Sequence, residues 1–309
     1  MKILVTGGAG FIGSHIVDSY LEAGHEVLVL DNLSSGAIRN INPKAKFYQA
    51  DICSSETEAI FKAEKPDIVN HLAAHVSVPN SIMDPMYDTQ VNALGLVNIL
   101  QACIKYNTHK IIFSSSGGAI YGDTEEYPTK ETCTPLPLSI YAINKMAGEQ
   151  YIKFYNHHHG LNYTILRYAN VYGPRQVSQG EGGVVATFIS QMLKGITPAI
   201  YSYPESPMGM IRDYVYVADV VYANVQALDL GDGETINIGT CTETNTTELY
   251  NELALQIGFK YSAASGSARA GDLRRNLLNI DKAKEVLNWE PKYSLKDGIA
   301  QTIDYFKNT

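Results

Sequence analysis

The sequence has few cysteines, and their spacing suits neither a metal site nor a disulfide framework. Cys53, Cys103, Cys133 and Cys241 are the only four among 309 residues, and they are far apart along the chain. A structural zinc site usually takes its cysteines from close CxxC pairs. We therefore expect reduced thiols, a cytoplasmic protein and no bound metal.

Long apolar runs and an excess of positive charge are also missing. No uncharged apolar stretch approaches the ~18 residues of a membrane span, and the opening MKILVTGGAG resembles a strand rather than a signal peptide. The 24 Lys and Arg against 32 Asp and Glu give a net charge of −8. Because a non-specific nucleic-acid binder usually carries the opposite sign, we expect neither nucleic acid nor membrane as a partner.

Strands and helices alternate through the first part of the chain. Lys2–Thr6, Glu26–Leu30 and Lys110–Ser114 are short apolar runs separated by segments with helical spacing. The two longest of the expected helices cover about Tyr87–Tyr106 and Ser139–His158. This alternation predicts an α/β fold, with a doubly wound parallel (Rossmann) sheet that has helices on both faces.

The alternation ends after Leu166, where Gly, Pro and Ser become frequent. A strand at Thr235–Ile238 could return the chain to the first sheet. Further helices are expected at Val184–Leu193, Asp219–Leu228, Thr247–Ile257 and Asp281–Leu287. We expect residues 1–168, with 213–239, to form the Rossmann domain. Residues 169–212 and 240–309 would form a smaller, interleaved α/β lobe that binds the substrate.

A glycine-rich loop follows the first expected strand and opens the first helix. Gly7, Gly10 and Gly13 satisfy GxxGxxG within TGGAGFIG, and Asp31 ends the next strand 18 positions after the last glycine. Glycines at these positions let the backbone approach a pyrophosphate, which the unpaired N–H groups of a helix N-terminus can bind. An aspartate at this point accepts hydrogen bonds from ribose hydroxyls and repels a 2′-phosphate. The loop therefore predicts NAD rather than NADP.

A YxxxK motif supplies a candidate general base. Tyr141 and Lys145 share one face of the expected helix, since positions i and i+4 are neighbours there. A nearby ammonium and a cationic nicotinamide favour the phenolate over the phenol, whose ordinary pKa is ~10, so that Tyr141 could act near neutral pH. Ser114–Ser116 ends the preceding strand, where parallel sheets place their ligands. A serine hydroxyl there could bridge Tyr141 and a substrate oxygen.

The motifs extend over essentially the whole chain. They are TGGAGFIG, HLAA (71–74), SSSGGAIYG (114–122), YAINK (141–145), LRYANVYGPRQ (166–176) and RDYVYVAD (212–219). Together they resemble the extended short-chain dehydrogenase/reductase superfamily, and within it the UDP-glucose 4-epimerase type. This resemblance implies NAD-dependent 4-epimerisation of a UDP-hexose. Tyr141 would take the proton of the 4-hydroxyl while hydride passes from C4 to NAD⁺, and the transient 4-keto sugar would turn and receive the hydride on its other face.

The resemblance also implies a set of site residues. Tyr141, Lys145 and Ser116 would be catalytic, with Ser115 as the alternative to Ser116 because this chain has an extra residue before Tyr121. Cofactor contacts would come from Gly7, Gly10, Phe11, Ile12, Gly13, Asp31, Asn32, Asp51, Ile52, Leu72, Ala73, Ala74, Asn92, Ser114, Tyr141, Lys145 and Tyr168. Substrate contacts would come from Ser116, Asn170, Val185, Tyr201, Arg212, Arg269, Asp272 and Asn276.

The implied substrate contacts have different roles. Asn170 would bind the diphosphate, and Arg212 and Arg269 would clamp it, since arginine suits bidentate phosphate contacts. Asp272 would bind the uridine ribose, and Tyr201 would stack on uracil.

In the resembled family, a residue of the pocket wall lies four positions after the ribose-binding aspartate, and a tyrosine there restricts the pocket to glucose and galactose. The count from Asp272 arrives at Asn276, whose smaller side chain would leave room beside the sugar C2. It would therefore admit UDP-N-acetylglucosamine and UDP-N-acetylgalactosamine besides UDP-glucose and UDP-galactose. Its amide could donate to the acetyl carbonyl. The alternative is a solvated loop residue with no part in sugar choice.

Other activities stay open. Gly117 and Gly118 stand where nucleotide-sugar dehydratases need an acid/base carboxylate pair, and the glutamate common in decarboxylases is absent from this stretch. A UDP-glucuronate 4-epimerase is a further possibility, because the sequence does not reveal what faces C6. Outside enzymes, the chain could be a non-catalytic, NAD-responsive binding module.

The resemblance further implies a homodimer. The two long helices would pair with their copies in a four-helix bundle. Ile152 and Tyr155 offer apolar positions away from the face that carries Tyr141 and Lys145. The alternative is that these positions pack only within one chain.

Overall fold

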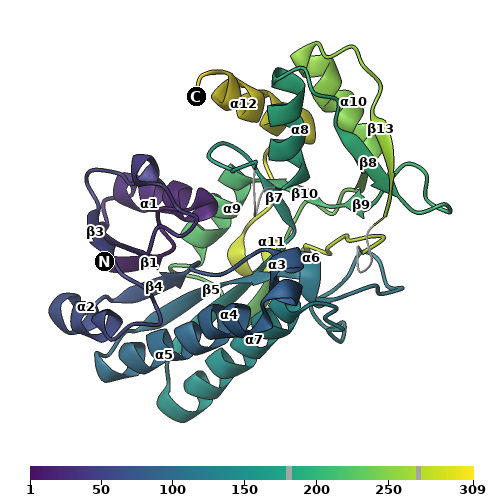
Figure 1. Ribbon diagram of the computed structural model, residues 1–309. Coiled ribbons are helices and arrows are strands. Elements are labelled where there is room, and N and C mark those ends of the chain that lie inside the picture. Colours follow the sequence, from purple (N-terminus) through teal and green to yellow (C-terminus); the bar gives the residue numbers. More distant parts are fainter. Residues whose placement is uncertain (179–182, 269–272) are drawn as a thin grey trace.

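A seven-stranded parallel sheet forms the centre of the molecule (Figure 1). The computed structural model describes residues 1–178, 183–268 and 273–309. The strand order is β11-β6-β5-β4-β1-β2-β3. The strands are β1 (Lys2–Thr6), β2 (Glu26–Asp31), β3 (Lys46–Gln49), β4 (Ile68–His71), β5 (Lys110–Ser116), β6 (Asn162–Tyr168) and β11 (Glu234–Ile238). The parallel Rossmann-type sheet expected from the alternation is therefore confirmed.

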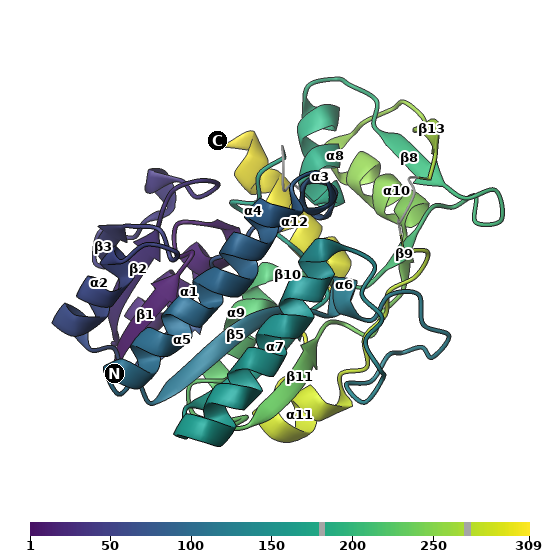
Figure 2. The same ribbon diagram turned by 60° about the horizontal axis from the view of Figure 1, so that its bottom comes forward.

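Helices cover both faces of this sheet (Figure 2). One face carries α2 (Glu56–Glu64), α5 (Leu96–Lys105) and α7 (Ile140–His159), and the other carries α1 (Phe11–Glu22), α9 (Val217–Gln226) and α11 (Asp281–Leu287). Successive β1 residues point to opposite layers, with Leu4 in one apolar cluster and Ile3 and Val5 in the other. Both layers are apolar because a parallel sheet is buried on both faces.

The long helix expected over about Tyr87–Tyr106 is present as a continuous helical run, but the expectation missed a π-helical interruption within it. The chain forms α4 (Pro85–Thr89), a π-helical segment (Gln90–Gly95) and then α5. Asn92 lies in the π-helical segment, and its side chain accepts from the backbone N–H of His75 (2.9 Å) and donates to its C=O (2.8 Å). A π-helical turn contains an extra residue, and the spacing of apolar residues gives no sign of it.

The second lobe has a core of its own. Its helices and strands are α8 (Val184–Leu193), α10 (Thr246–Ile257), α12 (Leu295–Lys307), β7 (Asn170–Tyr172), β8 (Ala199–Ser202), β9 (Ile211–Arg212), β10 (Tyr214–Tyr216), β12 (Thr244–Asn245) and β13 (Ala264–Ser267). The strands pair as β7 with β10, β8 with β13 and β9 with β12. Phe188 of α8, Leu253 of α10 and Ile299 of α12 are buried in one cluster. The sequence analysis did not predict α12.

Short elements complete the fold. They are the 3₁₀ helix Ile38–Asn40, α3 (Val78–Met83) and α6 (Gly117–Ile120). Within the described residues, no helix is both long and apolar enough to cross a membrane.

The chain returns to the first sheet through β11, which pairs in parallel with β6. A segment between β13 and α12 also packs on this sheet. Leu287 of α11 and Trp289 are fully buried in the same cluster as the α1 and α9 side chains, and the Trp289 Nε1–H donates to the backbone oxygen of Asp219 (2.9 Å). We retain the two-domain division as a proposal, with residues 281–289 assigned to the Rossmann domain.

Candidate active site

A cleft opens where the strand order reverses direction. The chain lays β2 and β3 on one side of β1 and β4, β5 and β6 on the other, so the connections after β1 and β4 diverge and leave a crevice at their carboxyl ends. We call this the central cleft. Among the residues lining it are Gly7, Gly10, Phe11, Ile12, Gly13, Asp31, Asn32, Asp51, Ile52, Leu72, Ala73, Ala74, Ser114, Tyr141, Lys145 and Tyr168. All of these were expected to contact the cofactor.

The glycine loop has no space for side chains. Gly7 has φ +72°, and a Cβ built there would lie 2.7 Å from the backbone nitrogen of Ala73. A Cβ on Gly13 would lie 2.2 Å from the oxygen of Gly7. The N-cap of α1 is Gly10, which offers no side-chain cap, so the first N–H groups of the helix remain able to bind an anion.

Asp31 holds the loop as well as facing the cleft. One carboxylate oxygen accepts from the backbone N–H of Ala9 (3.0 Å), and the other accepts from that of Leu33 (2.8 Å). Burial raises the pKa of Asp31, and these two N–H groups oppose the shift. A carboxylate has about four acceptor positions, so both oxygens can still accept from ribose hydroxyls.

Asn32 and Asp51, two other residues expected to contact the cofactor, contact each other. A third, Asn92, lies behind the wall of the cleft. The Asn32 amide donates to Asp51 (2.9 Å), whose other oxygen accepts from the N–H of Cys53 (2.7 Å). Asn92 does not line the central cleft and instead fixes the backbone of His75, which does. Asn92 thus supports the cleft through His75, and its expected ribose contact stays a prediction.

Tyr141 and Lys145 lie side by side at the start of α7. The helix is capped by Ser139, whose hydroxyl accepts from the N–H of Ala142, and the Tyr141 N–H donates to the Ser81 hydroxyl (3.2 Å). Lys145 Nζ lies 5.9 Å from the centre of the Tyr141 ring and donates to the backbone oxygen of Ser114 (2.8 Å). Burial lowers the pKa of Lys145 to about 8.

The two candidate serines have different surroundings. The Ser115 hydroxyl is buried and donates to Glu149 on α7 (2.6 Å). Ser116 stands at the N-cap of α6. A Cβ built on Gly118 would lie 3.8 Å from the Ser116 hydroxyl and 3.6 Å from Asn170 Oδ1. Ser115 is among the residues that line the central cleft, but its hydroxyl is already engaged by Glu149. Ser116 as the hydroxyl beside the substrate stays a prediction, with Ser115 as the alternative.

A buried ion pair supports the strand that carries these serines. Arg167 of β6 donates through Nε (2.9 Å) and Nη2 (2.6 Å) to the two oxygens of Glu149, and through Nη1 to the Tyr121 hydroxyl (2.8 Å). The Glu149 and Arg167 side chains are 0% and 5% exposed. Glu149 thus joins β5, β6 and α7 behind the central cleft.

The expected substrate residues are distributed over the second lobe. The Asn170 N–H donates to the backbone oxygen of Asp213 (2.9 Å), and its Oδ1 is buried without a hydrogen-bond partner among the described residues. Arg212 of β9 is half-buried, and the Tyr201 ring lies against Gly266 of β13. Val185 is 1% exposed and its side chain packs in the core of the lobe, so its expected substrate contact stays a prediction without support from the geometry. The expected diphosphate and ribose residues Arg269 and Asp272 lie outside the described residues.

The structure of Asn276 agrees neither with a solvated loop residue nor fully with a donor to the acetyl group. It is only 2% exposed, so it is not a solvated loop residue. Its Nδ2 donates to the backbone oxygen of Gly117 (2.9 Å), whereas its Oδ1 has no hydrogen-bond partner in the described parts of the chain. The side chain therefore offers an acceptor more readily than the donor that was expected.

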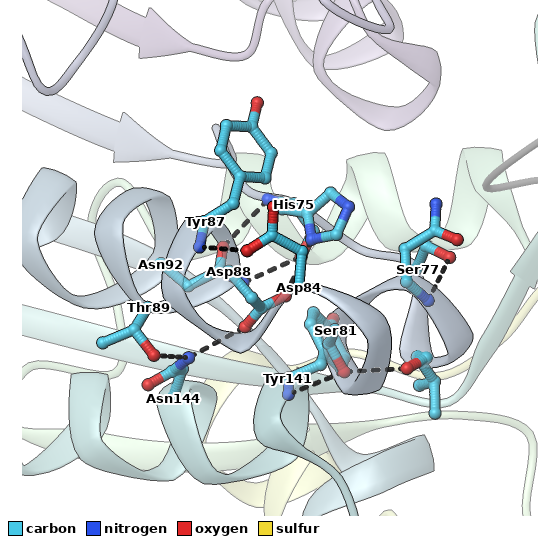
Figure 3. Close-up of polar contacts among 12 residues, drawn as sticks. His75, Ser77, Ser81, Asp84, Tyr87, Asp88, Thr89, Asn92, Tyr141 and Asn144 are labelled. Atoms are coloured by element: carbon cyan, nitrogen blue, oxygen red, sulfur yellow. Dashed lines mark hydrogen bonds and ion pairs between the residues drawn. The ribbon is translucent and has the colours of Figure 1, made fainter.

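The sequence analysis missed a polar cluster at one wall of the cleft (Figure 3). His75 and Tyr87 line the central cleft, with their rings 5.2 Å apart in an edge-to-face arrangement. The ring of His75 contacts the buried carboxylate of Asp88 (2.8 Å). His75 follows HLAA directly, but nothing in its local sequence indicates the partner.

The comparisons with known proteins agree with this geometry. Residues 3–239 match the model of the NAD dependent epimerase/dehydratase family. The chain is 41% identical to a UDP-glucose 4-epimerase of Mycolicibacterium smegmatis over 314 residues, which cover 100% of this chain and 99% of the relative.

Two solved structures have nearly the same fold. One is a UDP-glucose 4-epimerase from Thermotoga maritima with UDP-glucose (47% identity, TM-score 0.97, covering 100% of this chain and 99% of that one). The other is a UDP-glucose 4-epimerase from Thermus thermophilus in complex with NAD (41% identity, TM-score 0.94, covering 100% of both chains). The matched family model, the similarity over the full length and the shared fold lead to one conclusion: this chain belongs to the NAD dependent epimerase/dehydratase family, within the extended short-chain dehydrogenases/reductases.

Proposed function

We propose that this chain is an NAD-dependent UDP-hexose 4-epimerase that interconverts UDP-glucose and UDP-galactose. The observation that carries the proposal is the placement of Tyr141 and Lys145 in the same cleft as the glycine loop. A base beside a dinucleotide site is what oxidation and reduction at a sugar carbon require. The relatives in complex with UDP-glucose or NAD support the same assignment.

The residues present fit NAD. At Gly7 and Gly13 a Cβ would collide with backbone atoms, so only glycine lets the loop pack this closely, and the start of α1, capped by no side chain, stays available to a pyrophosphate. Asp31 would bind the adenosine ribose and disfavour a 2′-phosphate. When bound, NAD supplies a hydride acceptor and donor for the sugar C4 and is regenerated in each turnover.

The chain's own groups handle the proton and hold the substrate. Tyr141 would remove the proton from the 4-hydroxyl and return it after the sugar has turned. Lys145 holds its ammonium beside Tyr141, where a positive charge favours the phenolate. Ser116 would donate to the substrate oxygen. Arg212 would bind the diphosphate together with Arg269, leaving the sugar free to present either face.

This activity can be tested without adding cofactor. The purified protein should convert UDP-galactose to UDP-glucose on its own, and denaturing it should release NAD, since the proposed cycle never discharges the nucleotide. Release of NADP alone would contradict the role given to Asp31. Turnover of UDP-glucuronate with none of UDP-galactose would favour the uronate epimerase. NAD binding without turnover of any UDP-sugar would favour the binding module.

We also propose that the sugar site admits a 2-acetamido group, because Asn276 is much smaller than a tyrosine. UDP-N-acetylglucosamine and UDP-glucose should then both be substrates of the wild type. Asn276→Tyr should lower kcat/KM for the acetamido sugar relative to the plain one by about tenfold or more. Asn276→Ala is the matched control, because it adds no bulk and should leave the acetamido sugar accepted. An unchanged ratio in Asn276→Tyr, or no wild-type turnover of the acetamido sugar, would contradict this proposal.

We propose a homodimer formed through α5 and α7, which lie side by side on one face of the molecule (Figure 2). The expected contact residues need correction. Ile152 is 0% exposed and packs inside the chain, as Tyr155 does in part. Exposed apolar side chains are found instead at Leu94, Tyr151 and Phe154 (62%, 40% and 50% exposed).

Charges on this face should separate the dimer. The double variant Leu94→Asp, Phe154→Asp should have the 33.9 kDa mass of one chain by light scattering, whereas the wild type should have twice that mass. A buried unpaired carboxylate is too costly for an interface to accommodate. Leu255→Asp is the matched control, because Leu255 is 75% exposed on α10 in the other lobe. A monomeric wild type at micromolar concentration would refute the dimer.

We propose that the reaction takes place in the cytoplasm. Cys53, Cys103, Cys133 and Cys241 are all free thiols. This state is typical of proteins from reducing compartments.

A further inference from the structure

Asp88 is a completely buried carboxylate that the proposed mechanism does not use. It lies on α4 with 0% of its side chain exposed. One of its oxygens contacts His75 Nδ1 (2.8 Å), and the other accepts from the Asn144 amide (2.8 Å). Figure 3 shows these contacts, and it also shows the Asn144 amide bonded to the Thr89 hydroxyl (3.2 Å). Among the described residues, no lysine or arginine forms an ion pair with Asp88.

Keeping such a charge inside a protein is costly. Removing a carboxylate from water costs several kcal/mol, and contacts with an amide and a histidine ring offset this only in part. An asparagine of the same shape could bond to both neighbours without that cost. The retention of a charged group at this position therefore calls for a charge that it stabilises.

Lys145 is the buried cation next in sequence to Asn144. Its Nζ is held by the backbone oxygen of Ser114 (2.8 Å) and lies 5.0 Å from the centre of the Phe113 ring. Neither contact supplies a negative charge. Burial lowers the pKa of Lys145 to about 8, and Asp88 and then Glu149 are the groups whose charges oppose this shift.

The other titratable groups around Lys145 are neutral or already paired. Glu149, one turn further along α7, binds Arg167 through both oxygens. His71 of β4 is kept uncharged, because burial and the charge of Lys145 lower its pKa to about 3. Tyr141 of α7 is the group whose ionisation Lys145 assists. This leaves Asp88, which contacts His75 and the residue before Lys145 but no arginine or lysine among the described residues, as the carboxylate whose charge can act on Lys145.

We propose that Asp88 is a positioning residue that stabilises the protonated form of Lys145 and, through His75 and Asn144, fixes one wall of the central cleft to the start of α7. The contacts support both parts of this role. His75 belongs to the cleft lining and Asn144 to the helix that carries Lys145. The α4 helix that bears Asp88 is in turn capped by Asp84, whose side chain accepts from the N–H of Tyr87.

The kinetic consequence rests on the proposed function, whereas the ionisation of Lys145 does not. In the wild type, kcat/KM for UDP-galactose should fall above a midpoint of about pH 8, because a neutral Lys145 no longer favours the Tyr141 phenolate. Asp88→Asn removes the charge and keeps the shape. It should move this midpoint about one unit to lower pH. Thr89→Val is the matched control, because it removes a neutral hydrogen-bond partner of Asn144 and should leave the midpoint in place.

A charge swap separates the effect of the charge from that of the hydrogen bonds. In the double variant Asp88→Asn, Asn144→Asp, the amide now at position 88 can donate to the carboxylate now at position 144. The oxygen of that amide can still face His75. The negative charge then moves across one hydrogen bond, to the residue that precedes Lys145 on α7. The midpoint should return to the wild-type value. A midpoint that stays displaced in the swap overturns the proposal, because it would show that the hydrogen bonds rather than the charge matter.

Direct titration makes the test independent of turnover. The side-chain resonance of ¹³Cε-labelled Lys145, identified by its absence from Lys145→Met, should titrate at lower pH in Asp88→Asn and return in the swap. An unshifted resonance in Asp88→Asn overturns the proposal. If the single variant does not fold, the swap decides: a wild-type midpoint supports the role of the charge, and a displaced one overturns it. Absence of wild-type turnover would refute the proposed function and leave this titration interpretable.

Discussion

Tyr141→Phe should reduce the turnover of UDP-galactose by about 10²–10⁴-fold, the usual scale for removing a general base. The change deletes one hydroxyl and keeps the ring, so the packing of α7 should be preserved. Lys145 Nζ lies 5.9 Å from the centre of that ring, and the variant keeps this neighbour. The measurement is kcat at saturating UDP-galactose, with bound NAD quantified in the same sample.

Tyr155→Phe provides the control for this experiment. Tyr155 lies on the same helix and packs partly against the sheet, away from the central cleft. Its variant should keep near wild-type turnover and the same far-ultraviolet circular dichroism. If Tyr141→Phe also retained activity within a few-fold of wild type, another group would have to be the base.

Glu149→Ala should destabilise the protein by about 3–5 kcal/mol, the cost of leaving one member of a buried ion pair without its partner. The Arg167 side chain is only 5% exposed and directs two donors at Glu149. Without Glu149, the guanidinium would remain inside the core with those donors unpaired. The Ser115 hydroxyl would lose its acceptor as well. Urea unfolding followed by circular dichroism measures the change.

Replacing both charged residues is the informative control. The double variant Glu149→Leu, Arg167→Met fills a similar volume with apolar atoms and leaves no buried charge, so it should lose much less stability than Glu149→Ala. A loss below about 1 kcal/mol for Glu149→Ala would show that Arg167 finds water or another acceptor.

The Rossmann sheet could be predicted from the sequence because its signals are local. Lys2–Thr6 was expected with the bounds that the structure has, and the strands expected at Glu26–Leu30 and Lys110–Ser114 end within two residues of β2 and β5. Features set by distant contacts could not be predicted. The π-helical segment at Gln90–Gly95 depends on the bonds between Asn92 and His75, and β7 finds its partner β10 only after the intervening part of the second lobe.

The same distinction holds for the site. The glycine loop and the YxxxK pair are short motifs, so the sequence analysis identified them and the structure places them in one cleft. The supporting contacts have no such local signal. Ser115 and Glu149 are 34 positions apart, Glu149 and Arg167 are 18 apart, and His75 and Asp88 are 13 apart. Only the folded backbone brings these groups together, and the local sequence around one residue of a pair does not indicate its partner.

The late return of β11 affects how the chain is assembled during translation. β6 pairs with β5 on one edge and with β11 on the other. Ribosomes add about 5–20 residues per second, so several seconds pass between the emergence of β6 and that of Glu234–Ile238. During this interval the nascent sheet has an open edge, which can recruit strands from other chains. The time needed to synthesise the residues between β6 and β11, which include part of the second lobe, therefore determines when the open edge of β6 is closed.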